Sequence, residues 1–548
     1  MSEPDWAQYV PEVTLRDAQV DALGRIYRSM YEDGKRVVIL EAPTGIGKSI
    51  IQLALCRYVA ERPGGKSFMV TPQRSLQDQM RHWERLRVMK GKSSYDCLVL
   101  HGANARNAPC SIDASMREGH SECQVGRCPY YTALDAAVNS PTVVHNYMSL
   151  LAQARLTNHF GPRSLLCLDE GHTAVHWIRS FLTCEIEPDD LQSYIGESPP
   201  DNLELFLPWL RWHCIDLEEV PKGVTENMRN ALSSLLRYRE VFGALTRADL
   251  ERMHDESGED RSFESFAKRT LMTSGLVPWS TRWNDGNRWR KDGWWSIIPL
   301  RIAPMSDSLT GLGDKVLVVT ATALNKSLMM NEMGLSADDG EYIVIDSAFP
   351  IERRPIHKMY VGSMSYKHKK RTMPKMIRKL AQLANKHRDE PGIVHTVSHF
   401  LAEDIASELM HRLEGRPVIK LPRGSERDST IRMFLSGGYG PAAILVGPSL
   451  LEGLDGAGNS ARWQAMCKVP WPHMKDPVVE RMMSRQDPHG KRWAQQWYNW
   501  KTAQQTVQGF GRVVRSADDH GVTYLLDSGF DRVLKSGYIP DYVTAAVR

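Results

Sequence analysis

The chain lacks the features that would place it in a membrane or outside the cell. Its first residues, MSEPDWAQYV, contain no basic region followed by an apolar core, so we do not expect a secretory signal. No apolar run approaches the roughly 18 residues that a membrane-spanning helix needs. The net charge is only +4, so overall charge does not by itself indicate a nucleic-acid partner. These absences predict a soluble, cytoplasmic globular protein.

Cysteine is too scarce for a disulfide scaffold, with nine residues in 548. Five of them lie among apolar neighbours and are expected to be reduced core thiols: Cys56, Cys167, Cys184, Cys214 and Cys467. The other four gather in one short polar stretch: Cys97, Cys110, Cys123 and Cys128. Residues 90–130 are poor in large apolar side chains and cannot bury enough surface to fold alone. Metal ligation can supply that folding energy.

The spacing of these four cysteines narrows the choice of metal group. Structural zinc sites favour two pairs of cysteines two to four residues apart, and only the pair at 123 and 128 is close. Four thiolates with irregular spacing suit an iron–sulfur cluster, while zinc and a metal-free fold stay open as alternatives. His101 or His120 could replace one ligand, although a surface imidazole is the better default for both.

Short apolar runs without alternation recur in two batches, with helix-patterned segments such as residues 75–86 between them. The first batch is VVIL (37–40), SFMV (67–70), SLLCL (164–168) and KVLVV (315–319). The second is GIVHT (392–396), AAILVG (442–447) and VTYLL (522–526). Buried parallel strands have this pattern. It predicts an α/β fold with two doubly wound parallel-sheet lobes.

A glycine-rich loop, EAPTGIGKS (41–49), follows the first run. Gly45 and Gly47 would let backbone N–H groups approach a triphosphate. Lys48 would reach the β- and γ-phosphates, and the Ser49 hydroxyl would ligate Mg²⁺. Ala42 stands where the strict pattern has glycine, which is a mild departure. The ATP and Mg²⁺ site expected from this loop comprises Thr44, Gly45, Ile46, Gly47, Lys48 and Ser49.

Two carboxylates end the third apolar run, in SLLCLDEGH (164–172). The carboxyl edge of a parallel sheet would place Asp169 and Glu170 beside the phosphate loop. Asp169 would hold Mg²⁺ through water, and Glu170 would orient and deprotonate the attacking water. An isolated Asp-Glu pair is usually a surface pair, but beside such a loop it predicts hydrolysis of a nucleoside triphosphate.

A basic segment, QGFGRVVRS (508–516), lies near the C-terminus. On a helix, Gln508, Arg512 and Arg515 would share one face. Arginines there could stabilise charge on the γ-phosphate from a second lobe, so that hydrolysis opens and closes a cleft. Taken alone, the segment is better explained as a solvated basic face, and its weight comes from the other motifs.

In this order the motifs resemble those of superfamily 2 helicases. LRDAQ (15–19) resembles the Q motif, TPQRSLQDQ (71–79) motif Ia, DEGH (169–172) the DEAH box and TATAL (320–324) motif III. GIVHTVSHFLAEDIA (392–406), LLEGLDGAG (450–458) and QGFGRVVR (508–515) resemble motifs IV, V and VI. The cysteine insert narrows the resemblance to the XPD/DinG branch, whose members carry a [4Fe–4S] cluster there. Further branch-like segments are KGKSSYDC (90–97), CPYY (128–131), VVHNYMSLL (143–151) and WPHMKDPV (471–478).

The resemblance implies roles for individual residues. Arg16 and Gln19 suit adenine, His172 completes the catalytic box, and Asp455 of motif V joins the nucleotide site. The implied cluster ligands are Cys97, Cys110, Cys123 and Cys128. Implied contacts to single-stranded DNA are Thr71, Gln73, Arg74, Thr396, Ser398 and Glu452. Gly171 stands where relatives have Ala or Cys, and Thr320 where many have Ser.

The resemblance also implies a domain order. The first lobe would comprise residues 1–88, 141–177 and 298–326, and the second lobe residues 327–548. A cluster domain at 89–140 and a largely helical Arch-like domain at 178–297 would interrupt the first lobe.

Composition is uneven in the Arch-like region and beyond it. Five tryptophans stand near its end, Trp279, Trp283, Trp289, Trp294 and Trp295. We expect most of them to pack against the first lobe rather than stack on bases, and NDG (284–286) to form a hairpin. Residues 185–220 are acidic and residues 353–379 basic, and a solvated surface is the simpler explanation for both, although the basic run could touch phosphates.

Together these inferences predict an ATP-dependent DNA helicase that uses ATP, Mg²⁺ and a [4Fe–4S] cluster. Its substrates would be single-stranded and forked DNA, with 5′ to 3′ polarity on the resemblance alone. The alternatives are a partner-dependent translocase of a DinG-like CRISPR complex and an ATP-switched nucleic-acid clamp. A nuclease has no support, since no carboxylate cluster lies outside the ATPase motifs. The compact inserts and the absence of an N-terminal exonuclease extension favour a monomeric bacterial or phage member, with a recruiting protein as a further partner.

Overall fold

The computed structural model describes most of the chain. The described residues are 3–43, 45–72, 77, 80, 83, 86–112, 120–124, 126–155, 157–186, 196–197, 279–284, 294–299, 302–347, 349–424, 426–448, 461–484, 488–514 and 519–548. Most of the expected Arch-like domain and of the helix expected at 75–86 lies outside them, and Leu86 already begins a strand.

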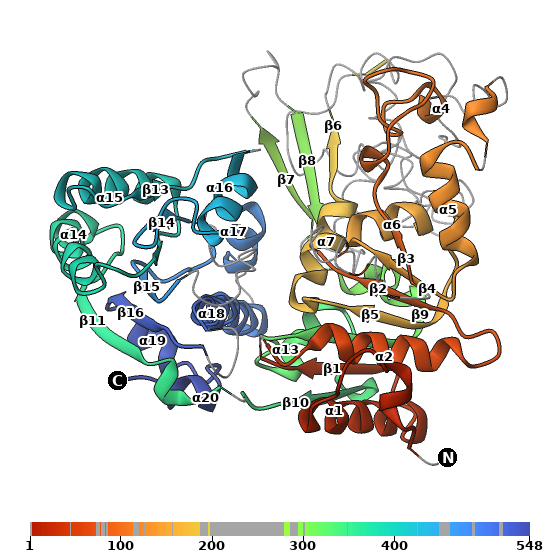
Figure 1. Cartoon of the computed structure of the whole chain (residues 1–548), viewed down its shortest axis with the longest axis horizontal. Helices are drawn as coiled ribbons and strands as arrows, with labels where there is room; N and C mark the ends of the chain where they lie inside the picture. The colour runs from red at the N-terminus through yellow and green to blue at the C-terminus, as the bar shows by residue number, and fades with distance from the viewer. Residues whose placement is uncertain are drawn as a thin grey trace, which may run out of the picture.

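The first lobe is a parallel sheet in the order β10-β1-β9-β5-β2-β4-β3 among the described residues (Figure 1). Its strands are β1 (Val37–Glu41), β2 (Ser67–Val70), β3 (Leu86–Met89), β4 (Thr142–His145), β5 (Arg163–Leu168), β9 (Gly313–Thr320) and β10 (Gly340–Val344). Every residue of β1, β2 and β4 is buried. Burial on both faces explains why these runs do not alternate. The strands expected from the first batch of apolar runs are confirmed.

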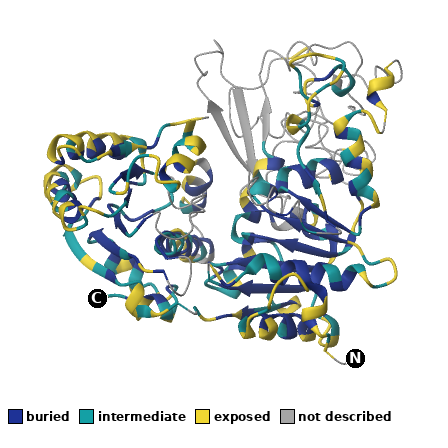
Figure 2. Ribbon diagram, viewed as in Figure 1, coloured by how far each residue is buried: buried dark blue, intermediate teal, exposed yellow. Residues whose placement is uncertain are grey.

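Helices cover both faces of this sheet and complete two apolar clusters (Figure 2). One face packs against α1 (Asp17–Tyr27) and α2 (Lys48–Ala60). The other face packs against α5 (Pro129–Asn139), α6 (Tyr147–Arg155), α7 (Ala174–Leu182) and α13 (Lys326–Glu332). The short α4 (Pro109–Ile112) lies in the cysteine-bearing insert between β3 and β4.

The second lobe is another parallel sheet, in the order β11-β16-β15-β12-β14-β13. Its strands are β11 (Ile356–Gly362), β12 (Gly392–His395), β13 (Val418–Lys420), β14 (Ile444–Gly447), β15 (Trp463–Met466) and β16 (Val522–Asp527). Its helices are α14 (Lys369–Lys386), α15 (His399–Arg412), α16 (Glu426–Leu435), α17 (Pro477–Met483), α18 (Pro488–Phe510), α19 (Phe530–Leu534) and α20 (Asp541–Thr544). The two-lobe α/β architecture expected from the sequence is therefore confirmed.

The expected boundary between the lobes at residues 326 and 327 is wrong. Strand β10 pairs in parallel with β1 and belongs to the first sheet, and α13 packs in the first lobe's core. The boundary therefore lies after Val344. Sequence reasoning missed β10 because it is a half-exposed edge strand without a continuous apolar run.

A small antiparallel sheet, in the order β6-β8-β7, stands above the first lobe in Figure 1. It comprises β6 (Cys184–Ile186), β7 (Trp279–Asn284) and β8 (Trp294–Pro299). The expected hairpin is confirmed by the antiparallel pairing of β7 with β8, but Asn284 pairs with Trp294, so the connection is longer than a tight turn at 284–286. The tryptophan side chains of this sheet lie outside the description, so their packing stays a prediction.

Helix α18 lies between the two sheets in Figure 1. Its Trp497 and Trp500, with Val478, Val479 and Met482 of α17, pack into the apolar cluster of the first lobe. Ala503 and Val507, further along the same helix, pack in the second lobe. One helix thus belongs to the cores of both lobes.

A membrane span has no candidate among the described helices, since none combines the necessary length with the necessary apolar character.

Candidate active site between the two lobes

The phosphate loop leaves the buried strand β1 and enters α2. Gly45 and Gly47 have φ of 84° and 85°, a conformation that glycine adopts without steric cost. Gly47 caps α2 and Ser49 lies in its first turn, so the positive end of the helix dipole faces the loop. Lys48 Nζ donates to the Ala42 carbonyl at 3.3 Å, which holds the ammonium within the loop.

The Q-motif residues brace this loop from α1. Arg16 donates to the carbonyl of Gly45 at 2.7 Å, and Gln19 Nε2 donates to the carbonyl of Ile46 at 3.0 Å. A Cβ on Gly47 would come within 2.3 Å of Gln19 Nε2. Glycine is therefore needed at Gly47 for close approach as well as for its backbone conformation. The adenine contact expected of Arg16 and Gln19 stays a prediction.

Asp169 lies at the end of β5, facing α2 and β2. Its two carboxylate oxygens accept hydrogen bonds from Gln52 Nε2 and Thr71 Oγ1, both at 3.4 Å. Burial first, and then the Glu170 carboxylate, raise the pKa of Asp169 to about 7 against the opposing effect of the Lys48 ammonium. A carboxyl group with this pKa gives up its proton readily to a cation, as a group that helps to hold Mg²⁺ must.

His172 connects this end of the first lobe to the second lobe. Its Nδ1 lies 2.9 Å from Thr320 Oγ1 and 3.5 Å from a Glu170 oxygen, and its Nε2 lies 2.5 Å from Gln508 Nε2. The Gln508 amide can donate only to a neutral imidazole that carries its proton on Nδ1. Burial favours this state, because it lowers the pKa of His172 to about 4.

Glu41 is a functional side chain that sequence reasoning missed. It ends β1 and is 4% exposed. One of its oxygens accepts from the backbone N–H of Leu324 at 2.5 Å and from the Tyr342 hydroxyl at 2.8 Å. Glu41 therefore fixes the turn after β9 that carries motif III. No local pattern could have revealed this, since Leu324 is 283 positions away.

The same turn is held from the second lobe by α18. Trp500 Nε1 donates to the carbonyl of Ala323 at 2.8 Å, and Gln504 Nε2 donates to the carbonyl of Thr322 at 2.7 Å. Gln508 also lies 3.4 Å from Thr322 Oγ1. Three side chains of α18 thus contact two backbone carbonyls and one hydroxyl of motif III.

The expectation that Gln508 and Arg512 share a helical face is wrong. Helix α18 ends at Phe510, and Arg512 lies in the turn that follows. Glycines at 509 and 511 disfavour helix continuation, and the Gly509 carbonyl accepts from Gln464 Nε2 at 3.0 Å and from the Arg512 N–H, only three residues on, at 3.3 Å.

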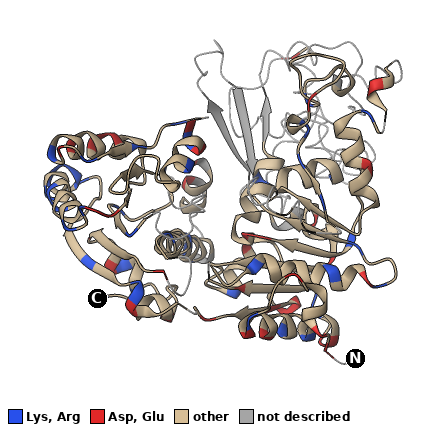
Figure 3. Cartoon of the chain, in the orientation of Figure 1, with Lys and Arg blue, Asp and Glu red and all other residues tan. Residues whose placement is uncertain are grey.

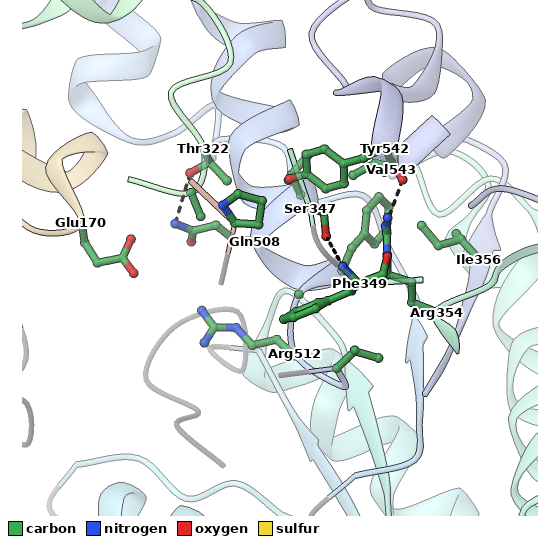
Figure 4. A pocket seen from close by; sticks show the side chains of 16 residues that line it. Glu170, Thr322, Ser347, Phe349, Arg354, Ile356, Gln508, Arg512, Tyr542 and Val543 are labelled. Carbon is green, nitrogen blue, oxygen red and sulfur yellow. Dashed lines mark hydrogen bonds between the residues drawn. The ribbon is translucent and has the colours of Figure 1, made fainter. Parts of the chain in front are cut away.

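Both residues nevertheless reach one cleft. The cleft has about 860 Å³ of empty space, including its open mouth. Pro43, Glu170 and Thr322 of the first lobe line it together with Gln508 and Arg512 of the second. Figure 4 shows Glu170, Gln508 and Arg512 around one opening. A carboxylate, an amide and a guanidinium from two lobes can here act on one phosphate chain.

Two family comparisons match both lobes. Residues 12–180 match the family described as type III restriction enzyme, res subunit. Residues 380–544 match the helicase C-terminal domain. The second lobe is therefore similar to helicase C-terminal domains, and the first lobe to a restriction-enzyme subunit family.

Curated proteins are similar to part of the chain. The chain is 31% identical over 138 residues to the Drosophila ananassae homolog of regulator of telomere elongation helicase 1, covering 23% of this chain and 13% of that protein. It is 30% identical over 105 residues to the human protein, covering 18% and 9% respectively. The chain thus spans a small part of the curated relatives that it matches.

Solved structures share the fold. An XPD helicase structure aligns with a TM-score of 0.56 at 14% identity, covering 96% of this chain and 99% of that one. The S. tokodaii Xpd4 structure aligns with a TM-score of 0.53 at 14% identity, covering 97% and 99%.

The residues expected to contact DNA divide into two groups. Thr71 is 2% exposed and Thr396 is fully buried, and Thr396 Oγ1 donates to the Ser398 carbonyl at 3.1 Å. This burial argues against a direct phosphate contact by either threonine side chain. Ser398 is exposed, and its hydroxyl caps α15 by accepting from Leu401 N at 3.2 Å. The predictions for Thr44, Gln73, Arg74, Glu452, Asp455 and Arg515 lie outside the described residues.

The four clustered cysteines of the chain line one cavity: Cys97, Cys110, Cys123 and Cys128. Burial raises the pKa of the Cys123 thiol, and the other three cysteines add to this shift. The Leu100 N–H donates to Cys97 Sγ at 3.4 Å, and Cys128 caps the N-terminus of α5, where the helix dipole favours a thiolate. Within the described part of the chain, no three metal-binding side chains are placed as ligands of a single metal ion.

Most of the basic run lies on β11 and α14, on the side of the second lobe that faces away from the first (Figure 3). Lys370, Arg371, Lys375 and Arg378 are exposed there, and Lys369 pairs with Asp404 at 3.8 Å. Arg354 and Ile356, at the start of the run, line the cleft, whereas the exposed cations of α14 do not. The acidic run at 185–220 lies almost wholly outside the described residues.

Proposed function

We propose that the chain is an ATP-dependent DNA helicase that moves along single-stranded DNA and hydrolyses ATP between its two lobes. The observation that carries the proposal is the cleft in which Glu170 faces Gln508 and Arg512. A phosphate loop with the sequence and backbone of a nucleotide-binding loop lies beside it. The match of residues 380–544 to the helicase C-terminal domain supports the same activity.

The residues have distinct roles in the proposed hydrolysis. Lys48 and the loop N–H groups bind the β- and γ-phosphates, and Ser49 and Asp169 hold Mg²⁺, which neutralises phosphate charge. Glu170 orients water for in-line attack on the γ-phosphorus and takes its proton, while the bond to the β-phosphate oxygen breaks. Arg512 stabilises the charge that develops on the transferred phosphoryl group, and Arg515 is proposed to assist it.

Loss of the γ-phosphate would be sensed through His172. Glu170 and Gln508 meet this imidazole from opposite lobes, at 3.5 and 2.5 Å. When Glu170 no longer faces a γ-phosphate and water, its contact with His172 changes, and Gln508 passes the change to α18. The motion of the second lobe would draw the strand past Ser398 and the motif V loop.

We also propose that Cys97, Cys110, Cys123 and Cys128 hold a [4Fe–4S] cluster. Their convergence on one cavity and the Leu100 N–H on Cys97 Sγ support a thiolate-bound group. When bound, the cluster supplies a cross-link for a segment with little apolar content. The 5′ to 3′ polarity and the bacterial or phage origin rest on family resemblance alone.

The test is unwinding of a 5′-tailed duplex by anaerobically purified protein, with iron and sulfide measured on the same sample. We expect DNA-stimulated ATP turnover, unwinding of the 5′-tailed but not the 3′-tailed duplex, and about four irons per chain. Lys48→Ala and Glu170→Gln should each abolish turnover, since each removes one step above.

Other outcomes identify the alternatives. Turnover without unwinding that a partner protein restores would indicate the partner-dependent translocase. Nucleotide-dependent DNA binding without steady turnover would indicate the ATP-switched clamp. Turnover and unwinding by a colourless, iron-free protein would remove the cluster from the proposal and leave the helicase activity.

A further inference from the structure

The face of α18 that meets the first lobe begins well before the recognised motif at 508. Trp497, Lys501, Gln504 and Gln508 stand at helical spacings of three or four residues and all contact the first lobe. Gln504 and Gln508 contact motif III, and Gln508 also contacts His172. The first two contact one carboxylate, Glu332 at the end of α13.

Both oxygens of Glu332 meet groups of the second lobe. Trp497 Nε1 donates to Glu332 Oε1 at 2.8 Å, and Lys501 Nζ lies 2.7 Å from Glu332 Oε2. The Glu332 side chain is 4% exposed and that of Lys501 is 19% exposed. The Lys501 ammonium also lies 4.7 Å from the ring centre of Trp500.

A pair buried to this extent adds little to stability, because desolvation offsets its attraction. The pair instead fixes the position of α18, because the indole N–H of Trp497 and the ammonium of Lys501 must each meet one oxygen of Glu332. A shift of α18 by one turn, about 5.4 Å, would leave a charge buried without a partner. The pair therefore selects one register of α18 on the first lobe.

The charges of Glu332 and Lys501 also act on His172 of the catalytic box. Among the charges that act on the pKa of His172, Lys501 lowers it and Glu332 raises it. Arg179 of α7, which follows the box, is half-buried, and Glu332 and Asp476 are the carboxylates that act on its pKa. Glu332 thus joins groups from α7, α13 and α18.

We propose that Glu332 and Lys501, with Trp497, are positioning residues for ATP hydrolysis. They hold α18 in the register in which Gln508 reaches His172 and the turn after the helix presents Arg512 to the cleft. Gln508 lies seven residues beyond Lys501, roughly 10 Å along a rigid helix. The inference rests on the proposed function, but no recognised motif contains these residues.

The experiment compares Lys501→Met and Glu332→Gln with Lys491→Met, an exposed lysine on the same helix that serves as the matched control. We expect kcat of DNA-stimulated ATP turnover to fall about tenfold in the first two variants, with KM for ATP within about twofold of the parent. The ATP-binding groups of the first lobe stay in place, which explains the split. Lys491→Met should leave both constants unchanged, and Lys501→Arg should recover part of kcat.

A second measurement separates positioning from general damage to the fold. If the pair acts through Gln508, adding Lys501→Met to Gln508→Ala should lower kcat no further than Gln508→Ala alone. Additive losses, or an unchanged kcat in Lys501→Met and Glu332→Gln, would overturn the inference. If Lys48→Ala and Glu170→Gln retained turnover, the proposed function itself would fail, so the two failures are distinguishable.

Discussion

Three residues at the carboxyl ends of strands hold the left-handed backbone conformation although none is glycine. Glu170, Leu324 and Val397 follow β5, β9 and β12 and have φ of 46°, 58° and 67°. Such residues cost about 1–3 kcal/mol each and persist where surrounding contacts hold them in place. Glu170 lines the cleft, and Leu324 lies in the motif III turn. Val397 lies between Thr396 and Ser398, in the segment proposed to follow the DNA strand.

Val397→Gly should make the protein more stable by about 1 kcal/mol. A β-branched side chain is strained at φ of 67°, whereas glycine adopts this conformation freely, and the gain exceeds the extra entropy of glycine in the unfolded chain. The midpoint of thermal unfolding should rise. An unchanged or lower midpoint would mean that Val397 packing outweighs the strain.

Glu41→Ala should lower stability by about 2–3 kcal/mol. It removes one acceptor from two donors, the Leu324 N–H and the Tyr342 hydroxyl, and leaves both without their partner. Tyr342→Phe is the control, since it removes one donor and should cost about 1 kcal/mol. Denaturant unfolding measures both. Equal losses in the two variants would show that the motif III turn does not depend on Glu41.

Individual residues could be predicted from the sequence where they belong to a local motif. The loop around Lys48, the pair Asp169–Glu170 and Gln508 are of this kind, and the structure brings Pro43 at the start of the loop, Glu170 and Gln508 to one cleft. Glu332 could not be identified, because its partner Trp497 is 165 positions away and neither stands in a distinctive pattern. A polar contact between residues far apart in the sequence produces no local pattern from which it could be predicted.

Among the elements, strands with continuous apolar runs were predictable and edge strands were not. β1 and β9 are central and buried on both faces, so their sequences contain unbroken runs of Val, Ile and Leu. β10 and β13 are edge strands with exposed residues and no such run. The end of α18 was missed because the Gly509 carbonyl there accepts from Gln464, a residue of β15 that lies 45 positions away.

The cysteine-bearing element offers a test by ligand removal. Cys110→Ser should eliminate absorption near 400 nm and lower iron content, because a cubane cluster needs four thiolate ligands. The segment from residue 90 to 128 should then become sensitive to protease, since it has little apolar content of its own. Turnover without DNA should persist, because no cysteine lines the cleft as described.

Cys467→Ser is the matched control for this experiment. Cys467 is a buried thiol in the core of the second lobe, away from the cysteine cavity. Its replacement should leave iron content unchanged. Iron retention by Cys110→Ser would contradict the proposed ligand set.

For the whole molecule, stability should fall as pH is lowered from 6.5 toward 5. Burial lowers the pKa of His145 to about 3 and those of His172 and His395 to about 4. The unfolded chain binds these protons near pH 6.5 and the folded chain does not, so each histidine costs about 1.4 kcal/mol per pH unit in this window.

Asp169 acts in the opposite sense, because its folded pKa of about 7 exceeds the unfolded value of 3.8. Its protonation on acidification therefore favours the folded state. The three histidines outweigh it, so the net loss corresponds to roughly two such contributions. The midpoint of thermal unfolding between pH 7.5 and 5 measures this, since ordinary carboxyl groups titrate below that window. A constant midpoint would contradict it.

The sharing of α18 between two cores has a consequence for biosynthesis. The apolar cluster of the first lobe is complete only when Trp497 and Trp500 are present, yet its last strand ends at Val344. At about 5–20 residues per second, the ribosome needs on the order of ten seconds or more to make the intervening chain. During that interval the nascent first lobe presents an uncovered apolar patch beside α7 and α13. Chaperone binding at this stage, rather than folding of the lobe as an independent domain, is the expected course of its synthesis.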